Sequence, residues 1–483
     1  MLLLPAALAA DPMLALDRHF EVDQGRACLT GVMHDVVSNW DTLTPAEQAR
    51  AIDALSPFGD TLGPVQKHEG ASLGEDSCVG QQMANRVTGT HFVVEWDDGA
   101  TENTAESLLE SLEHSYEVEI EESGWRAPDG DDTFLLPVYI SDDNMGGAYT
   151  YVQSCRGQYL PYVVVGRDAA TWGSWTETMA AHEFNHTLQF GYSYAPEFWW
   201  WEATATYIEE VVYPNYDWWA DYVTGYADNP HIAMAASSQE DYDVFMHMYG
   251  MAIWGFYLAE YHGGQETVRA TWEEARGGYE EYGAADMAED LGLDLDTVYV
   301  DFITRNAAME YADHRKFPDV DEVARIDELP ASGEAERSTK PEGYGQNYIR
   351  IEAGAGEGDL VVTFEGDADV DWAVVLAEIS NEAVLRSEWV RVEGGAGEIT
   401  LEDIGEEDVM LIVSPLADGE NKRDYSWTAE VKAAEEPVAD EDPAGDPSGD
   451  EKVSLGGACG CASGGGAPMG LALLAAMAVR RRR

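Results

Sequence analysis

The sequence His182-Glu183-Phe184-Asn185-His186 decides the interpretation of the whole chain. It has the form H-E-x-x-H, and on a helix its two histidines lie one turn apart, so that both imidazoles project from the same face. There they can reach one zinc ion at about 2.0–2.1 Å. Glu183 then lies beside them, where its carboxylate can hold a metal-bound water and take its proton.

The residues before and after this pentapeptide predict one long helix. Ser174-Trp175-Thr176-Glu177 has the spacing of a capping box, in which the Ser hydroxyl and the Glu carboxylate each accept from a free backbone amide. Gly191 is a typical residue just beyond a helix C-terminus. On its own, H-E-x-x-H also fits a core helix with two hydrogen-bonded histidines, so the next helix is needed to decide.

The second helix is predicted over residues 198–210 and ends before Pro214. Its residues are mostly aromatic, small or apolar, so the helix should be buried, and a buried carboxylate needs a cation or hydrogen-bond donors. Glu202 is therefore the unusual residue in it. Two histidines and one glutamate leave a fourth position open for water, as in catalytic zinc sites. The longer metzincin pattern is excluded, because Gln189 and Tyr192 occupy the positions of its Gly and third His.

His182-Glu183-x-x-His186 followed by Trp201-Glu202-Ala203-x-Ala205 resembles the gluzincin class of zinc metallopeptidases, and in particular a group of secreted metalloproteases of myxobacteria. The resemblance implies one catalytic zinc ion with His182, His186 and Glu202 as ligands. It implies Glu183 as the general base. The interval to Glu202 is shorter than in thermolysin-type enzymes, which leaves Glu209 or Glu210 as alternative ligands.

Helical spacing suggests further roles near this site. Thr206, one turn after Glu202, is a candidate to orient an imidazole. A buried helix is predicted over residues 247–258. Four side chains are eligible to stabilise an oxyanion beside the metal, although aromatics at helical spacing belong more often to a core. They are Tyr249, His247, Tyr207 and Tyr192.

The predicted catalytic domain, residues 89–329, has α+β composition. Strands are expected at residues 91–96, 134–140 and 162–165, with an amphipathic helix at 104–114 and helices up to about residue 310. An edge strand beside the zinc would bind substrate backbone by β-augmentation, and we assign it to residues 151–165. The fold expected is zincin-like.

A second domain is predicted at residues 340–432, after the polar stretch 330–336. Short alternating runs bounded by Gly and Asp indicate an all-β sandwich, which resembles the jelly-roll accessory domains of secreted bacterial peptidases. The runs are residues 347–351, 360–364, 372–376, 409–413 and 425–431. The acidic segment 367–371 suits Ca²⁺ chemically, but an acidic turn explains it better because no complete calcium-loop pattern surrounds it.

The two ends of the chain suggest export. Residues 1–10 resemble the end of a signal peptide without its basic start, and residues 11–88 form an N-terminal region that is either a pro-segment or a subdomain. Cys28, Cys78 and Cys155 allow one disulfide and one free thiol, with the pairing open. Residues 433–455 form an acidic, disordered linker.

The last segment, residues 456–483, combines a Gly-Cys motif, an apolar run at 467–479 and four terminal arginines. It closely resembles the myxobacterial sorting signal MYXO-CTERM, with a plain hydrophobic tail anchor as the runner-up. The resemblance implies contact with a sorting and processing machinery and retention at the cell surface or outer membrane, or release outside the cell. Membrane contact is expected only through this segment.

The net charge of the chain limits the classes of molecule that it can bind. With 92 acidic and 27 basic residues the formal charge is −65, so binding to nucleic acid or to an anionic membrane surface is disfavoured. We interpret this acidity as a solvated surface, suited to salty surroundings.

The function predicted is hydrolysis of protein or peptide substrates by a zinc-dependent metalloprotease, an endopeptidase. One alternative is a catalytically inactive surface adhesin or binding protein with a peptidase-like domain. The intact Glu183 argues against that alternative. A zinc-dependent amidase or aminopeptidase acting on cell-wall peptides is a further possibility.

Overall fold

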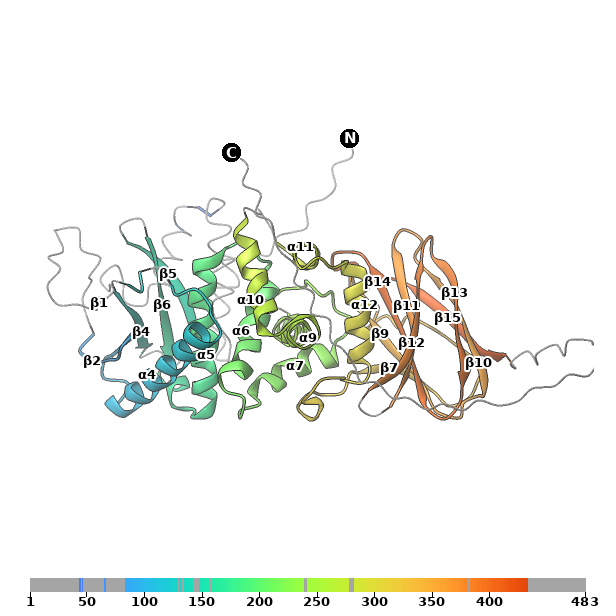
Figure 1. Ribbon diagram of the computed structural model, residues 1–483, viewed down its shortest axis with the longest axis horizontal. Coiled ribbons are helices and arrows are strands. Elements are labelled where there is room, and N and C mark those ends of the chain that lie inside the picture. Colours follow the sequence, from blue (N-terminus) through green and yellow to red (C-terminus); the bar gives the residue numbers. More distant parts are fainter. Residues whose placement is uncertain are drawn as a thin grey trace, which may run out of the picture. The chain divides into compact units, whose positions relative to one another are not determined.

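The computed structural model describes residues 43, 44, 46, 65–66 and 83–432, except 129, 133, 142–146, 156–157, 239–240, 278–281 and 381–382. The predicted signal peptide at 1–10, most of 11–88 with Cys28 and Cys78, the linker 433–455 and the sorting segment 456–483 lie outside the described residues. The described part of the chain is α+β, with a strand-rich C-terminal region (Figure 1). Within it, no helix is long and apolar enough to cross a membrane.

A mixed sheet forms the N-terminal part of the described chain. Its strands are β1 (Val65–Gln66), β2 (Asn85–Thr88), β3 (Phe92–Trp96), β4 (Phe134–Ser141), β5 (Ala148–Cys155) and β6 (Gln158–Gly166). Their order is β2-β3-β4-β6-β5, with β1 paired to β4. The pairs β3–β4 and β4–β6 are parallel and β5 runs antiparallel to β6. Parallel strands buried on both faces read as continuous apolar runs, which is why sequence located them.

The predicted edge segment 151–165 contains two strands rather than one. β5 is an outer strand of the described sheet, as β2 is at the opposite edge, and β6 lies inside the sheet between β4 and β5. The two strands form a hairpin whose register pairs Tyr151 with Tyr162. The prediction of an edge strand therefore applies to β5 and is wrong for β6.

Helices fill the middle of the chain. They are α4 (Glu102–Tyr116), the π-helical η2 (Glu117–Glu122), η3 (Ala169–Thr171), α5 (Ser174–Tyr192), α6 (Phe198–Val212), α7 (Trp218–Asp228), α8 (Tyr242–Gly250), α9 (Ala252–His262), α10 (Gln265–Glu274), η4 (Ala275–Gly277), α11 (Ala284–Asp290), α12 (Leu295–Asn306) and η5 (His314–Lys316). The two predicted helices at 174–190 and 198–210 are α5 and α6. They pack against each other, and α5 also packs on β5 and β6 (Figure 1).

The ends of α5 differ from the prediction. Gly173, with φ of 64°, is the N-cap, and Ser174 is already helical, so no capping box forms. The Ser174 hydroxyl instead accepts from the indole Nε1 of Trp218. At the other end the helix continues through Gly191 and is capped at Ser193. Tertiary contacts have overridden the local signals at both ends.

The predicted helix at 247–258 is two helices, α8 and α9, which meet at Met251. Gly250 allows α8 to approach α7 closely, since a Cβ there would lie 2.5 Å from the backbone nitrogen of Tyr226. Helix contact, rather than a sequence break, sets the boundary between them.

Two sheets make up the strand-rich region. Their strands are β7 (Glu322–Ile326), β8 (Ala331–Glu334), β9 (Asn347–Ile351), β10 (Gly358–Gly366), β11 (Asp371–Ile379), β12 (Val384–Val392), β13 (Ala396–Ile404), β14 (Asp408–Leu416) and β15 (Tyr425–Lys432). One sheet has the order β13-β10-β15-β8 and the other β12-β11-β14-β9-β7. Side chains from both sheets form a common core, including Val362, Trp372 and Trp427.

These sheets begin earlier in the sequence than residue 340. β7 pairs with β9, and β8, inside the polar stretch 330–336, pairs with β15. Gly333 explains why this polar segment can be a strand: its missing side chain leaves room for the indole of Trp427, which a Cβ would meet at 2.9 Å.

The acidic segment 367–371 is a turn whose carboxylates form ion pairs with arginines. Asp369 pairs with Arg423 at 2.9 Å, and Asp371 pairs with Arg391 at 2.9 Å. These carboxylates already have cationic partners from the chain itself. They do not form a calcium-binding group among the described residues.

Candidate metal centre

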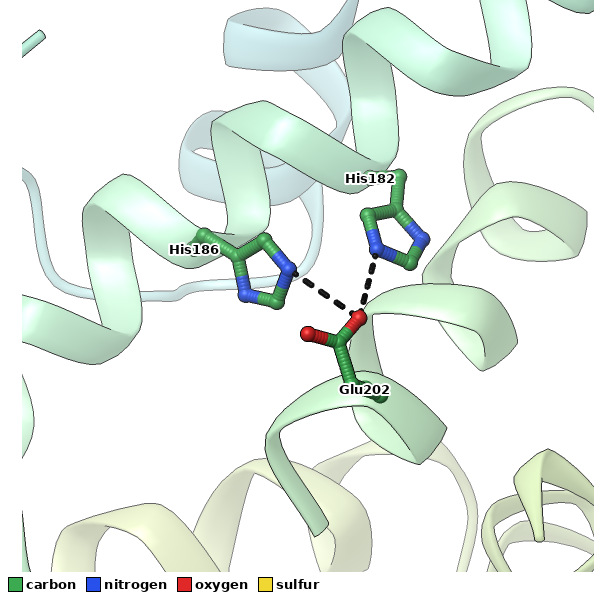
Figure 2. Close-up of side chains that lie close together, drawn as sticks. All are labelled: His182, His186 and Glu202. Atoms are coloured by element: carbon green, nitrogen blue, oxygen red, sulfur yellow. Dashed lines mark hydrogen bonds and ion pairs between the residues drawn. The ribbon is translucent and has the colours of Figure 1, made fainter. Parts of the chain in front are cut away.

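Helices α5 and α6 bring His182, His186 and Glu202 to one point. Figure 2 shows both imidazoles of α5 directed at a single carboxylate oxygen of α6. Oε2 of Glu202 lies 3.2 Å from Nε2 of His182 and 3.5 Å from Nε2 of His186. The three side chains are buried, and one ligand atom from each lies within 4.8 Å of the others. This buried group could bind a metal ion.

Two of the three separations between these ligand atoms are close to those of a tetrahedral zinc site. Two ligand atoms that are each about 2.0–2.1 Å from a tetrahedral zinc ion lie about 3.3–3.4 Å apart. The two distances from Oε2 of Glu202, 3.2 and 3.5 Å, fall on either side of that value. Nitrogen and oxygen donors of this type suit zinc, and three protein ligands leave one position for water or substrate.

Glu209 holds the other nitrogen of His182. Its Oε1 lies 3.0 Å from Nδ1, on the opposite side of the ring from Glu202. Burial lowers the pKa of His182, but its hydrogen bonds to Glu202 and Glu209 outweigh burial and raise that pKa to about 10. Burial also raises the pKa of Glu202, whereas the charge of His186 and the hydrogen bond from His182 lower it to about 2. The site therefore pairs acidic oxygens with a positive charge.

His186 leaves one buried nitrogen without a hydrogen bond among the described residues. Its Nδ1 lies 2.7 Å from Oε1 of Gln189, an acceptor, so Nδ1 carries a proton. Its Nε2 is buried without a hydrogen-bond partner among the described residues, as is Oε1 of Glu202. A buried polar atom left without a partner costs about 1–3 kcal/mol. A metal ion between Nε2 and the carboxylate would satisfy these atoms.

Glu183 lies beside the histidines and contacts the edge strand. Oγ1 of Thr150, on β5, is 2.7 Å from Oε2 of Glu183 and 2.8 Å from its backbone oxygen. Glu183 and His182 line a small cavity that reaches the start of β5 and is also lined by aromatic side chains of α7 and α8. A carboxylate in this place can orient a water molecule and accept its proton.

The alternative ligands are placed elsewhere. Glu209 faces Nδ1 of His182 rather than the point where the three ligand atoms meet. Glu210 binds Lys316 at 2.8 Å and accepts from Nε1 of Trp219. Oγ1 of Thr206 has no hydrogen-bond partner among the described residues, so the prediction that Thr206 orients an imidazole is wrong.

Of the four candidate oxyanion residues, Tyr249 is the one beside the site. Its ring stacks on His182 at 5.9 Å, and Tyr222 of α7 stacks on Tyr249 at 5.2 Å. Tyr207 packs on Phe256. The other two also point to different neighbours: Tyr192 OH accepts from the backbone of Arg126, and His247 packs near Tyr226.

Sequence reasoning missed Gln189, Thr150 and Tyr222. Gln189 has a signal, since it lies three residues after His186 on the same helix face. Thr150 and Tyr222 have none, because their positions depend on strand pairing and on the packing of α7.

No protein-family model matches the chain, and no curated protein matches it. Among solved structures, it is similar to the pre-peptidase C-terminal domain of a collagenase from Bacillus anthracis, at 11% identity over 23% of this chain and 100% of that one, with a TM-score of 0.19. It is also similar to tripeptidyl peptidase 2, at 12% identity over 25% of this chain and 11% of that one, with a TM-score of 0.19. It is similar as well to a β-glucosidase from Paenibacillus barengoltzii, at 12% identity over 33% of this chain and 20% of that one, with a TM-score of 0.11. Scores this low carry no argument about function.

Proposed function

We propose that the chain is a zinc-dependent peptidase of the gluzincin type, acting on protein or peptide substrates. The observation that carries the proposal is the meeting of His182, His186 and Glu202 around one point, with Nε2 of His186 buried and, in the part of the chain that the structure describes, without a hydrogen-bond partner. These residues would hold the ion. When bound, zinc polarises a substrate carbonyl and lowers the pKa of a bound water.

The residues of the chain supply the remaining steps. Glu183 takes a proton from the attacking water and later delivers it to the leaving amine, which is general base and then general acid catalysis. Thr150 donates to the Glu183 carboxylate and so fixes its direction. The antiparallel strand β5 is the outer strand of the described sheet that packs beside α5, where its backbone can pair with an extended substrate. A mixed sheet beside an H-E-x-x-H helix supports a zincin-like fold.

Export to the cell surface or outer membrane, or release from the cell, belongs to the same proposal. It rests on the resemblance of residues 456–483 to a sorting signal, and the strand-rich region would then be an accessory domain outside the cell. A binding protein without activity stays the second candidate, since a metal group alone does not require catalysis.

The test uses the purified full chain with casein and a panel of peptides that includes cell-wall peptides. We expect about one equivalent of zinc per chain, and cleavage that a chelator stops and zinc restores. Glu183→Gln should keep the zinc and lose cleavage by at least about 10²-fold, the lower range for a general base. Glu177→Gln, on the first turn of the same helix, is the matched control and should cleave as the wild type does.

The outcomes separate the candidates. Cleavage that survives the chelator or the Glu183→Gln change would refute the mechanism. A chain that binds zinc and cleaves nothing would favour the binding protein. Cleavage confined to cell-wall peptides would point to an amidase.

A further inference from the structure

A chain of buried hydrogen bonds runs from the candidate metal centre to the far side of α5. Nδ1 of His186 bonds Oε1 of Gln189 at 2.7 Å, and Nε2 of Gln189 donates to Oδ1 of Asn185 at 2.9 Å. Nδ2 of Asn185 then donates to Oε2 of Glu119 at 2.9 Å. Glu119 comes from η2, a π-helical turn after α4. All four side chains are fully buried.

A backbone carbonyl fixes the orientation of the Gln189 amide, and with it the direction of these hydrogen bonds. Nε2 of Gln189 also donates to the carbonyl oxygen of Trp201, at 3.1 Å, and that oxygen can only accept. The amide nitrogen of Gln189 must therefore face Trp201, which turns its amide oxygen toward His186. Trp201 directly precedes Glu202 on α6, so the same amide also ties α5 to the helix that carries the third ligand.

We propose that Gln189 is a positioning residue, which holds His186 with its proton on Nδ1 and its Nε2 lone pair directed at the metal, and that Asn185 and Glu119 hold Gln189 in this orientation. The inference rests on the proposed function for the identity of the metal. The tautomer it assigns to His186 does not, because the contacts of Gln189 fix it without an ion.

Glu119, at the far end of this series of hydrogen bonds, acts as a hydrogen-bond acceptor. Burial raises the pKa of Glu119 well above its usual value, although the hydrogen bond from Asn185 and the charge of His182 oppose the shift. A neutral side chain at this position still offers an oxygen to Nδ2 of Asn185. Glutamine should therefore replace Glu119 with little effect, whereas leucine removes the acceptor and leaves Asn185 free to rotate.

The distinction from a purely structural role lies in the nitrogen that carries the proton. If Gln189 only fills space, an apolar side chain of similar length should leave the ligand nitrogen of His186 unchanged. If Gln189 positions His186, the same change should free Nδ1 and let the proton exchange between the two nitrogens. Partners of metal-bound histidines typically contribute about 10–100-fold in metal affinity.

The experiment uses the full chain labelled with ¹⁵N-histidine, in the metal-free form at about pH 8 and then with zinc. In the wild type we expect the spectrum of His186, assigned with His186→Asn, to show the proton on Nδ1. Gln189→Met should mix the tautomers and weaken zinc binding about 10–100-fold in competition with a chromophoric chelator. Gln189→Glu retains an acceptor and should retain the tautomer.

Two further variants control for changes in packing. Thr187→Val removes a buried hydroxyl of the same helix that donates to the carbonyl oxygen of Phe184, outside the hydrogen bonds of Gln189, and it should change neither readout. Glu119→Leu should shift both readouts in the direction of Gln189→Met, while Glu119→Gln should not. This pair also tests the proposal if Gln189→Met does not fold.

The results for the two proposals can be told apart. A wild-type tautomer and zinc affinity in both Gln189→Met and Glu119→Leu would overturn the positioning role. A wild type that binds no zinc, yet loses the Nδ1 tautomer in these variants, would keep the positioning role and refute the proposed zinc site.

Discussion

Glu209 provides the test that distinguishes a residue that binds the metal from a residue that only holds a metal-binding histidine in place. It contacts Nδ1 of His182, so its loss should loosen the imidazole without removing a donor from the metal. We expect Glu209→Ala to weaken zinc binding about 10–100-fold and Glu209→Gln to weaken it less, because an amide oxygen still accepts from Nδ1. Glu202→Ala should abolish stoichiometric binding.

Zinc content after dialysis and affinity by chelator competition measure the difference. Glu210→Gln, on the neighbouring position of α6 and bound to Lys316 rather than a histidine, is the control. If Glu209→Ala lost zinc as completely as Glu202→Ala, Glu209 would be a ligand and the assignment from the geometry would be wrong.

His247 predicts a dependence of stability on pH that is independent of the metal. Burial, helped by the charge of His231, lowers its pKa to about 3, so the folded chain leaves it neutral where the unfolded chain protonates it. The unfolded state then binds more protons, and stability falls as the pH drops from about 6.5 toward 3. At pH 5 this costs about 2 kcal/mol relative to pH 8.

Urea unfolding of the wild type and of His247→Gln at pH 5 and pH 8 measures this contribution. The variant should lose less stability than the wild type between the two pH values, by about 2 kcal/mol, whatever its stability at pH 8. Equal losses in the two proteins would show that His247 is protonated in the fold.

The candidate ligands were predictable at this scale because each combines a residue type with a spacing. Two histidines one turn apart identify a helix face, and Glu202 is a carboxylate in an otherwise apolar helix. Thr150 carries no such contrast, since a buried hydroxyl gains its role only from the neighbour that packing brings to it, and Gln189 has only its spacing from His186. Thr206, chosen by spacing alone, was wrong for this reason.

At the scale of elements, the contact between α7 and α8 gives a test by substitution. A Cβ on Gly250 would lie 2.5 Å from the backbone nitrogen of Tyr226 and 2.8 Å from the oxygen of Tyr222, both on α7. Gly250→Ala must therefore separate the helices, and overpacking of this kind costs about 1–3 kcal/mol. Gly191→Ala, in α5 with no atom within 4 Å of its Cβ, should instead stabilise by about 0.5–1 kcal/mol.

Thermal or urea unfolding of the two variants measures both effects. Opposite signs for the two substitutions are expected. If Gly250→Ala were as stable as the wild type, α8 could shift without cost, and the stacking of Tyr249 on His182 would not be a fixed feature of the site.

Two of the strands that sequence missed, β12 and β8, have no clear apolar face of their own. β12 is largely exposed along its length and carries charged residues at many positions, and β8 contains almost nothing apolar. Both exist because a neighbour offers a free strand edge: β11 for β12, and β15 for β8. The buried strands β10, β11 and β14 were predicted because burial leaves a pattern in the sequence.

At the scale of the whole chain, the strand-rich region and the helices share one core. Ala373 and Val375 of β11 and Tyr348 of β9 belong to the same buried cluster as residues of α12. The hydroxyl of Tyr299, on α12, bonds the backbone of Tyr344 and the side chain of Gln346. The alternation of apolar and polar residues within the strands indicated a β-sandwich. It could not show which outer face of the sandwich is covered by another element.

The charge of the chain predicts how its stability depends on salt. A net charge of −65 repels itself in the compact state more than in the unfolded state. The distance over which charges act shrinks from about 10 Å at 0.1 M salt to about 3 Å at 1 M. We therefore expect the melting temperature to rise steadily as NaCl is raised from about 0.1 M to 1 M, where screening removes most of the repulsion.

Differential scanning calorimetry at fixed pH measures this shift, with sucrose at matched osmolality as the control for solute exclusion. A rise with NaCl that exceeds the rise with sucrose assigns the effect to screening. The ion pairs of the described chain, such as Arg350 with Glu322 at 2.7 Å, weaken with salt and oppose the trend. A melting temperature that falls with NaCl would mean that these local pairs outweigh the repulsion among the 92 acidic side chains, and that the acidity is not a cost to the fold.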